Sequence, residues 1–199
     1  IGTGLMGTAE LSILEAKKEV AKFGEISERH IKMVRDLLTE KDKKKAKKML
    51  KRIKKYEDIT DRIEAEVTEY LTKVSQGKLS NESSRMVRVM LSIINDLERI
   101  SDICYQMSIN LDRKIEEKIW FSAEQRKELL SLFSLVDKAV VNMHKNLDKN
   151  YSQIHFNDAE DMEDDINKKR NSMRKEHLEN TEKGEYNFEL NGLNEELSF

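Results

Sequence analysis

The chain has 199 residues, of which 37% are charged and 38% are hydrophobic, with seven glycines, no proline and one cysteine. A chain this poor in glycine and proline cannot supply the many tight turns of an all-β sandwich or barrel. A single cysteine excludes a disulfide framework. The 36 basic and 38 acidic residues nearly cancel, so the net charge gives no indication of a nucleic-acid-binding protein.

The spacing of the apolar residues, mostly three and four apart, predicts five long amphipathic helices. We expect them at about residues 9–38, 41–76 and 81–117, then from Ser122, and from Asn157 to about residue 183. Residues 194–199 are typical of the start of a sixth helix. The predicted fold is therefore all-α.

Local signals mark several of the expected helix ends. Ser122 and Gln125 have the spacing of a capping box, and Asn157 is expected to cap the fifth helix. Gly77 is a stop signal after the second helix. On the first helix, we expect the buried stripe to begin at Leu11 and Leu14.

A short internal repeat suggests how the helices are grouped. Residues 56–63 (YEDITDRI) align without gaps on residues 159–166 (AEDMEDDI). A repeat at corresponding positions indicates two similar units. We expect two tandem three-helix bundles of long antiparallel helices, at 9–120 and 121–199.

The second of these bundles is expected to be truncated at its third helix. The sequence begins at Ile1 without an initiator methionine and ends at Phe199 inside an amphipathic pattern. It is therefore interpreted as a fragment of a longer protein, with residues 1–8 as a leader or linker from a preceding segment.

Two acidic residues interrupt an apolar row on the third predicted helix. Glu98 and Asp102 lie one turn apart, and neither has a cation at i±4 that could neutralise it. Carboxylates in such a row should be partly buried, and buried carboxylates need partners. Their like charges also repel each other at this spacing.

The same Glu-x-x-x-Asp spacing occurs at Glu57 and Asp61 and again at Glu160 and Asp164. If the second and third helices pack side by side, two such pairs face one groove. Four carboxylates form the kind of site that hard divalent or trivalent cations require. The alternative is that these carboxylates are surface charges paired with lysines from other helices.

Enzyme signatures are weak in this sequence. None of the four histidines is part of the Glu-x-x-His motif of di-iron bundles. His30 is expected to be a core histidine, and Cys104 lies on an apolar stripe, where packing is its expected role. We therefore expect no catalytic activity, although a metal-dependent hydrolase that uses the carboxylates and a plain helical scaffold both remain as alternatives.

A strongly basic run, residues 41–55, contains ten basic residues and one acid. Because the apolar stripe continues through it, the run is first of all the solvated face of a packed helix. A second interpretation is attraction to an anionic surface, either membrane headgroups or an acidic protein. Nucleic acid is disfavoured because no aromatic platform accompanies the run. Trp120 and Phe121 form either a hydrophobic staple or a docking surface.

The motif NDLERISD at residues 95–102, preceded by Glu57 and Asp61 and repeated at Glu160 and Asp164, resembles the PhoU family. The opening LEAKKEV at residues 14–20 is similar to the start of the PhoU-like region that follows the membrane part of bacterial sodium/phosphate cotransporters. The resemblance implies two three-helix bundles. It also implies motifs that can hold metal clusters, with Glu57, Asp61, Glu98 and Asp102 as candidate ligands and Glu160 and Asp164 as half of a second site.

From this resemblance we expect a non-enzymatic regulatory domain in phosphate transport or signalling. Its implied metal is divalent or trivalent, one of iron, zinc, magnesium or calcium. Its implied location is cytoplasmic, at the inner face of the plasma membrane, and its implied partner is a membrane transporter domain or the phosphate-uptake machinery. An incomplete second bundle also makes a homodimer plausible, and no nucleic-acid partner is expected.

Overall fold

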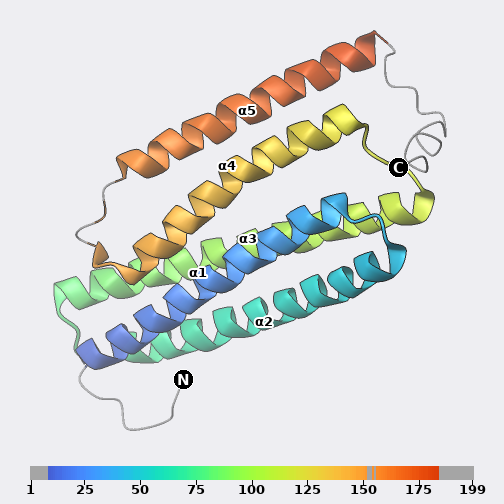
Figure 1. The fold of residues 1–199 in the computed structure, drawn as a ribbon. Helices are drawn as coiled ribbons and strands as arrows, with labels where there is room; N and C mark the ends of the chain where they lie inside the picture. Colours follow the sequence, from blue (N-terminus) through green and yellow to red (C-terminus); the bar gives the residue numbers. More distant parts are fainter. Residues whose placement is uncertain (1–8, 152–153, 155, 184–199) are drawn as a thin grey trace.

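The computed structural model of the protein describes residues 9–151, 154 and 156–183. This part of the chain contains five α-helices and no strand, which confirms the all-α prediction (Figure 1). Their bounds agree with the expected ranges to within two residues: α1 Ala9–Thr39, α2 Lys43–Ser75, α3 Asn81–Glu117, α4 Ala123–Asp148 and α5 Asn157–Glu182. The expected leader at 1–8 and the sixth helix at 194–199 lie outside the described residues.

Short polar side chains begin three of these helices. The Asp42 carboxylate accepts hydrogen bonds from the first backbone N–H groups of α2, and the Ser80 hydroxyl does the same for α3. The capping box expected before α4 is confirmed, because Ser122 and Gln125 bond to each other's backbone N–H. The expectation for α5 is wrong: Asn157 is its first helical residue, and Phe156 occupies the capping position without a side-chain hydrogen bond.

The helices form a bundle in which α1 contacts three others. It packs against α2, α3 and α4, while α2 and α3 pack against each other. α5 packs on α4 and lies at the outer edge of the molecule, farthest from α2 (Figure 1). None of the described helices combines the length and the apolarity needed to cross a bilayer.

The core consists of two clusters stacked along the bundle. Helices α1 to α3 supply most of both, and α4 adds Val140 to one and Leu147 to the other. The buried residues of α3 follow one continuous stripe, which includes Met90, Leu97 and Cys104. Burial raises the pKa of the Cys104 thiol to about 12, which agrees with a packing role.

The buried face of α1 differs from the expected one at its start. Leu11 and Leu14 are 52% and 56% exposed, whereas Ile13 and Ala16 are buried. The expected stripe followed the largest side chains. The actual phase is set by the continuous face further along the helix, where small residues allow neighbouring helices to approach closely.

One such close approach is between α1 and α4. A Cβ atom added to Gly24 would lie 2.5 Å from Leu147 Cδ1 and 3.8 Å from the His144 Cα. Any larger residue at position 24 must therefore displace Leu147 or push α4 outward. Beside this contact, His144 Nδ1 lies 3.0 Å from the Glu28 carboxylate.

Candidate metal centre

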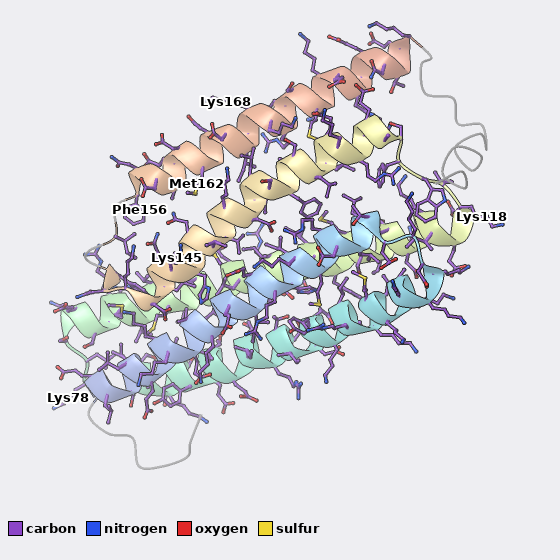
Figure 2. All side chains as sticks on the ribbon, viewed as in Figure 1. Lys78, Lys118, Lys145, Phe156, Met162 and Lys168 are labelled. Atoms are coloured by element: carbon purple, nitrogen blue, oxygen red, sulfur yellow. The ribbon has the colours of Figure 1, made fainter. Side chains whose placement is uncertain are left out.

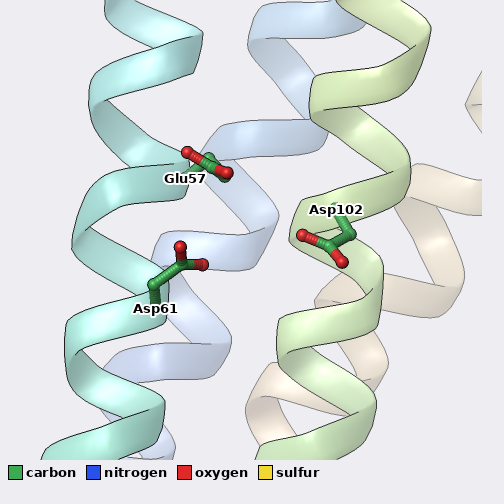
Figure 3. A group of neighbouring side chains, drawn as sticks. All are labelled: Glu57, Asp61 and Asp102. Atoms are coloured by element: carbon green, nitrogen blue, oxygen red, sulfur yellow. The ribbon is translucent and has the colours of Figure 1, made fainter.

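Three acidic side chains meet between α2 and α3. Glu57 and Asp61 lie one turn apart on α2, and Asp102 faces them from α3 (Figure 3). Each offers one carboxylate oxygen, and these oxygens all lie within 4.8 Å of one another. Glu57 is half-buried, while Asp61 and Asp102 are exposed. The structure thus brings together three of the four ligands expected for the first bundle.

A buried chain of hydrogen bonds lies directly behind these carboxylates. The Thr60 and Ser101 hydroxyl oxygens are 2.7 Å apart, and His30 Nδ1 lies 2.9 Å from the Ser101 oxygen. All three side chains are fully buried, and His30 is the core histidine expected from the sequence. Because Thr60 and Ser101 directly precede Asp61 and Asp102, this chain fixes the separation of α2 and α3 where the carboxylates meet.

Glu98, the fourth expected ligand, lies beside the group but outside it. It is half-buried, and this burial raises the pKa of its carboxyl, with further increases from Asp102 and then from Asp61 and Glu64. Glu98 therefore binds a proton more readily in the folded protein than in the unfolded chain. A cation bound by Asp61 and Asp102 would reduce the repulsion between their carboxylates and that of Glu98, since it would neutralise their charge.

The expectation of partial burial is confirmed for Glu98 and wrong for Asp102. At 100° per residue, adjacent positions on α3 differ strongly in their direction. Ser101 takes the inward direction and is fully buried, which leaves Asp102 at the solvent edge of the α2–α3 interface. A site at this edge is open to ions from solution.

Lys54 is a member of the site that the sequence interpretation missed. Its Nζ lies 2.6 Å from Glu57 Oε2 and 3.1 Å from Asp58 Oδ1, and 4.7 Å from the centre of the Tyr105 ring. The two carboxylates raise the pKa of Lys54, so it remains charged. Its position three residues before Glu57 was the available signal, since residues three apart on a helix are neighbours.

The spacing of the three carboxylates fits a hard cation. Oxygen ligands bind Ca²⁺ at about 2.3–2.6 Å, so two ligands of one ion can be up to about 5 Å apart. A smaller ion such as Mg²⁺, bound at about 2.0–2.1 Å, would need the side chains to draw closer. All-oxygen donors favour such hard ions over thiophilic ones.

Glu160 and Asp164, the candidates for a second site, are exposed near the start of α5. Among the described residues, no third acidic, histidine or cysteine side chain joins them in a group of the kind formed by Glu57, Asp61 and Asp102. Their role as half of a metal site stays a prediction.

Comparison with protein families finds one match for this chain. The model of the PhoU domain family matches residues 20–111, which run from α1 through α2 into α3. This range includes all four candidate ligands of the first bundle and excludes Glu160 and Asp164. No curated protein and no solved structure matches the chain. The match therefore includes both helices that carry the carboxylate group, α2 with Glu57 and Asp61 and α3 with Asp102.

Proposed function

We propose that this protein is a metal-binding regulatory domain that acts in phosphate transport or phosphate signalling. The match of residues 20–111 to the PhoU domain supports the phosphate-related regulatory role. As a finer proposal, the domain is the cytoplasmic part of a sodium/phosphate cotransporter. The resemblance of residues 14–20 to the segment that follows the membrane part of such transporters supports this placement.

The convergence of Glu57, Asp61 and Asp102 carries the metal-binding proposal. Three negative charges from two helices lie within 4.8 Å, and among the described residues Lys54 supplies the ammonium group in contact with Glu57. A bound cation would supply the remaining positive charge. It would displace Lys54 from Glu57 and add a link between α2 and α3, and a change in the stability of this helix contact is what a regulatory domain can transmit.

A regulatory role is favoured over catalysis by the side chains around the group. The described neighbours of the three carboxylates are further acids, one lysine and the hydroxyls of Thr60 and Ser101 behind them. Both hydroxyls are fully buried, so neither can reach a substrate. Metal-stimulated phosphoester hydrolysis that is lost in Asp102→Asn would favour the hydrolase alternative instead.

Metal analysis of protein purified without chelators tests the proposal. We expect bound metal in the wild type and a loss of at least tenfold in Glu57→Gln/Asp102→Asn. Glu66→Gln/Asp96→Asn is the matched control, since both residues are exposed on the same two helices and the charge change is identical. Equal metal content in all three proteins would refute the metal site and leave a helical scaffold.

The transporter context has a separate test. The reading frame upstream of Ile1 is expected to encode membrane helices, and deletion of the region encoding α1 to α3 is expected to change sodium-dependent phosphate uptake in cells. An upstream reading frame without membrane helices would refute the tethered arrangement and leave a domain that acts on a separate transporter.

A further inference from the structure

We propose that the first half of α2 is a binding surface for anionic lipid headgroups. This surface, which we call the basic face, consists of four lysines spaced four, three and four residues apart: Lys44, Lys48, Lys51 and Lys55. At this spacing their side chains leave one side of the helix within an arc of about 60°. All four are exposed.

The basic face points away from the bundle. Ala46 and Ile53, on the opposite side of the same helix turns, are 1% and 0% exposed and form part of the core. α2 lies at the edge of the molecule opposite α5 (Figure 1), so no described helix covers this side. The row is about 17 Å long at 1.5 Å per residue, which is long enough to contact several lipid headgroups.

The lysines of the basic face form no described ion pair, although Asp42 at the start of α2 interacts electrostatically with Lys48. Lys43 and Lys47, on its flank, pair with Glu116 of α3 at 2.9 Å and 3.2 Å. Within the described part of the chain, no ion pair is formed by Lys44, Lys48, Lys51 or Lys55. Unpaired lysines on a solvated helix attract an anionic surface that approaches to within about 8 Å, the screening length at physiological salt.

Apolar and basic residues lie at the end of the bundle where the basic face begins. The pairing of Lys43 with Glu116 places the end of α3 beside the start of α2. Directly after α3, Lys118 projects from this end (Figure 2), and Ile119 is 46% exposed. An exposed aliphatic side chain beside several lysines fits the boundary between headgroups and acyl chains.

The aromatic side chains near the basic face favour lipid over nucleic acid. Binding of nucleic acid without sequence specificity uses exposed aromatic rings on which bases stack, whereas Trp120 is partly buried and packs against the core cluster that contains Ala46 and Ile53. The acidic group at Glu57, Asp61 and Asp102 lies further along α2. Its repulsion from an anionic membrane would orient the bundle with the start of α2 toward the lipid.

Vesicle flotation tests this proposal with the full chain. The probes are vesicles of phosphatidylcholine alone and vesicles in which about a third of the lipid is phosphatidylserine. We expect binding to the anionic vesicles only, weakened by salt. The test variant replaces the basic face: Lys44→Gln, Lys48→Gln, Lys51→Gln and Lys55→Gln. Its partition coefficient is expected to fall about six-hundredfold, because each of the four lysines near an anionic surface contributes about fivefold.

The matched control carries the same charge change on α1, α4 and α5, at exposed lysines without described ion pairs: Lys18→Gln, Lys138→Gln, Lys145→Gln and Lys168→Gln. We expect its partition coefficient to change by less than about threefold. Ile119→Ser is expected to weaken binding severalfold, since it removes exposed apolar surface. Circular dichroism verifies that the variants remain helical.

Several outcomes would overturn the proposal. These are no binding to anionic vesicles, equal binding to neutral ones, or equal loss of binding in the test and control variants. Tighter binding to a duplex oligonucleotide or to an acidic peptide than to the vesicles, at the same salt concentration, would assign the basic face to that partner instead.

Discussion

Protonation of His30 is expected to make the stability of the bundle depend on pH. The imidazole is fully buried, and its described polar contact is the hydrogen bond between Nδ1 and the Ser101 hydroxyl. Nε2 has no hydrogen-bond partner in the described part of the chain. Burial therefore lowers the pKa of His30 from 6.5 to about 4, because the charged form would lose its hydration without gaining a counter-ion.

The sign of the effect follows from the two pKa values. Below pH 6.5 the unfolded chain binds a proton at His30, whereas the folded protein does not until about pH 4. Stability is therefore fully present above the unfolded pKa and falls as the pH decreases between these values. From about pH 7.5 to about pH 5, His30 alone lowers the free energy of unfolding by about 2 kcal/mol.

Urea denaturation at these two pH values, followed by circular dichroism, measures the effect. His30→Gln retains a polar side chain that does not titrate, and His30→Leu fills a similar volume without polar atoms. Both variants are expected to lose about 2 kcal/mol less than the wild type between about pH 7.5 and about pH 5. When the loss of a variant is subtracted from the loss of the wild type, the contribution of the carboxylates, which both proteins share, cancels. Equal losses in all three proteins would refute the reasoning, since His30 would then be protonated inside the fold.

Three further predictions concern the helix contacts. Lys54→Gln is expected to raise the affinity for a divalent cation severalfold, measured by calorimetry, because it removes the ammonium that competes at Glu57; unchanged or weaker affinity would contradict this competition. Thr60→Val is expected to lower the free energy of unfolding by about 1–2 kcal/mol, since the buried bond to Ser101 is lost, and urea denaturation that shows no loss would argue against the hydroxyl chain. Gly24→Ala gains about 1 kcal/mol of helix propensity but meets Leu147 at a cost of about 1–3 kcal/mol. A net stabilisation by thermal denaturation would contradict the close approach of α1 and α4.

The helices themselves could be predicted closely from the sequence. Their periodicity is strong, and the absence of proline leaves few positions where a helix could end. The phase of a helix was less predictable where large side chains compete. Leu11 and Leu14 were expected in the core, but the buried face contains Ala16 and Gly24, whose small size lets a neighbouring helix pack closely. The need for a small residue at these positions is visible only once the neighbouring helix is in place.

The carboxylate group could also be predicted only in part from the sequence. The spacing of Glu57 and Asp61, and their pairing with α3, followed from helix geometry and side-by-side packing. The exposure of Asp102 did not, because it depends on how α3 rotates to bury Ser101. Lys54 was overlooked because only the neighbours of the α3 acids were considered. Its distance from Glu57 nevertheless follows from an i,i+3 spacing that the sequence displays.

The position of α5 determines how the described structure opens. None of its residues is fully buried, and it packs on α4, whereas α1 packs against three helices. Backbone amides in an element with so little buried surface exchange with solvent through local unfolding that costs far less than global unfolding. α5 can therefore separate while the α2–α3 interface and its carboxylates stay intact. Among the described helices, those that match the PhoU domain are therefore expected to stay folded after α5 has separated.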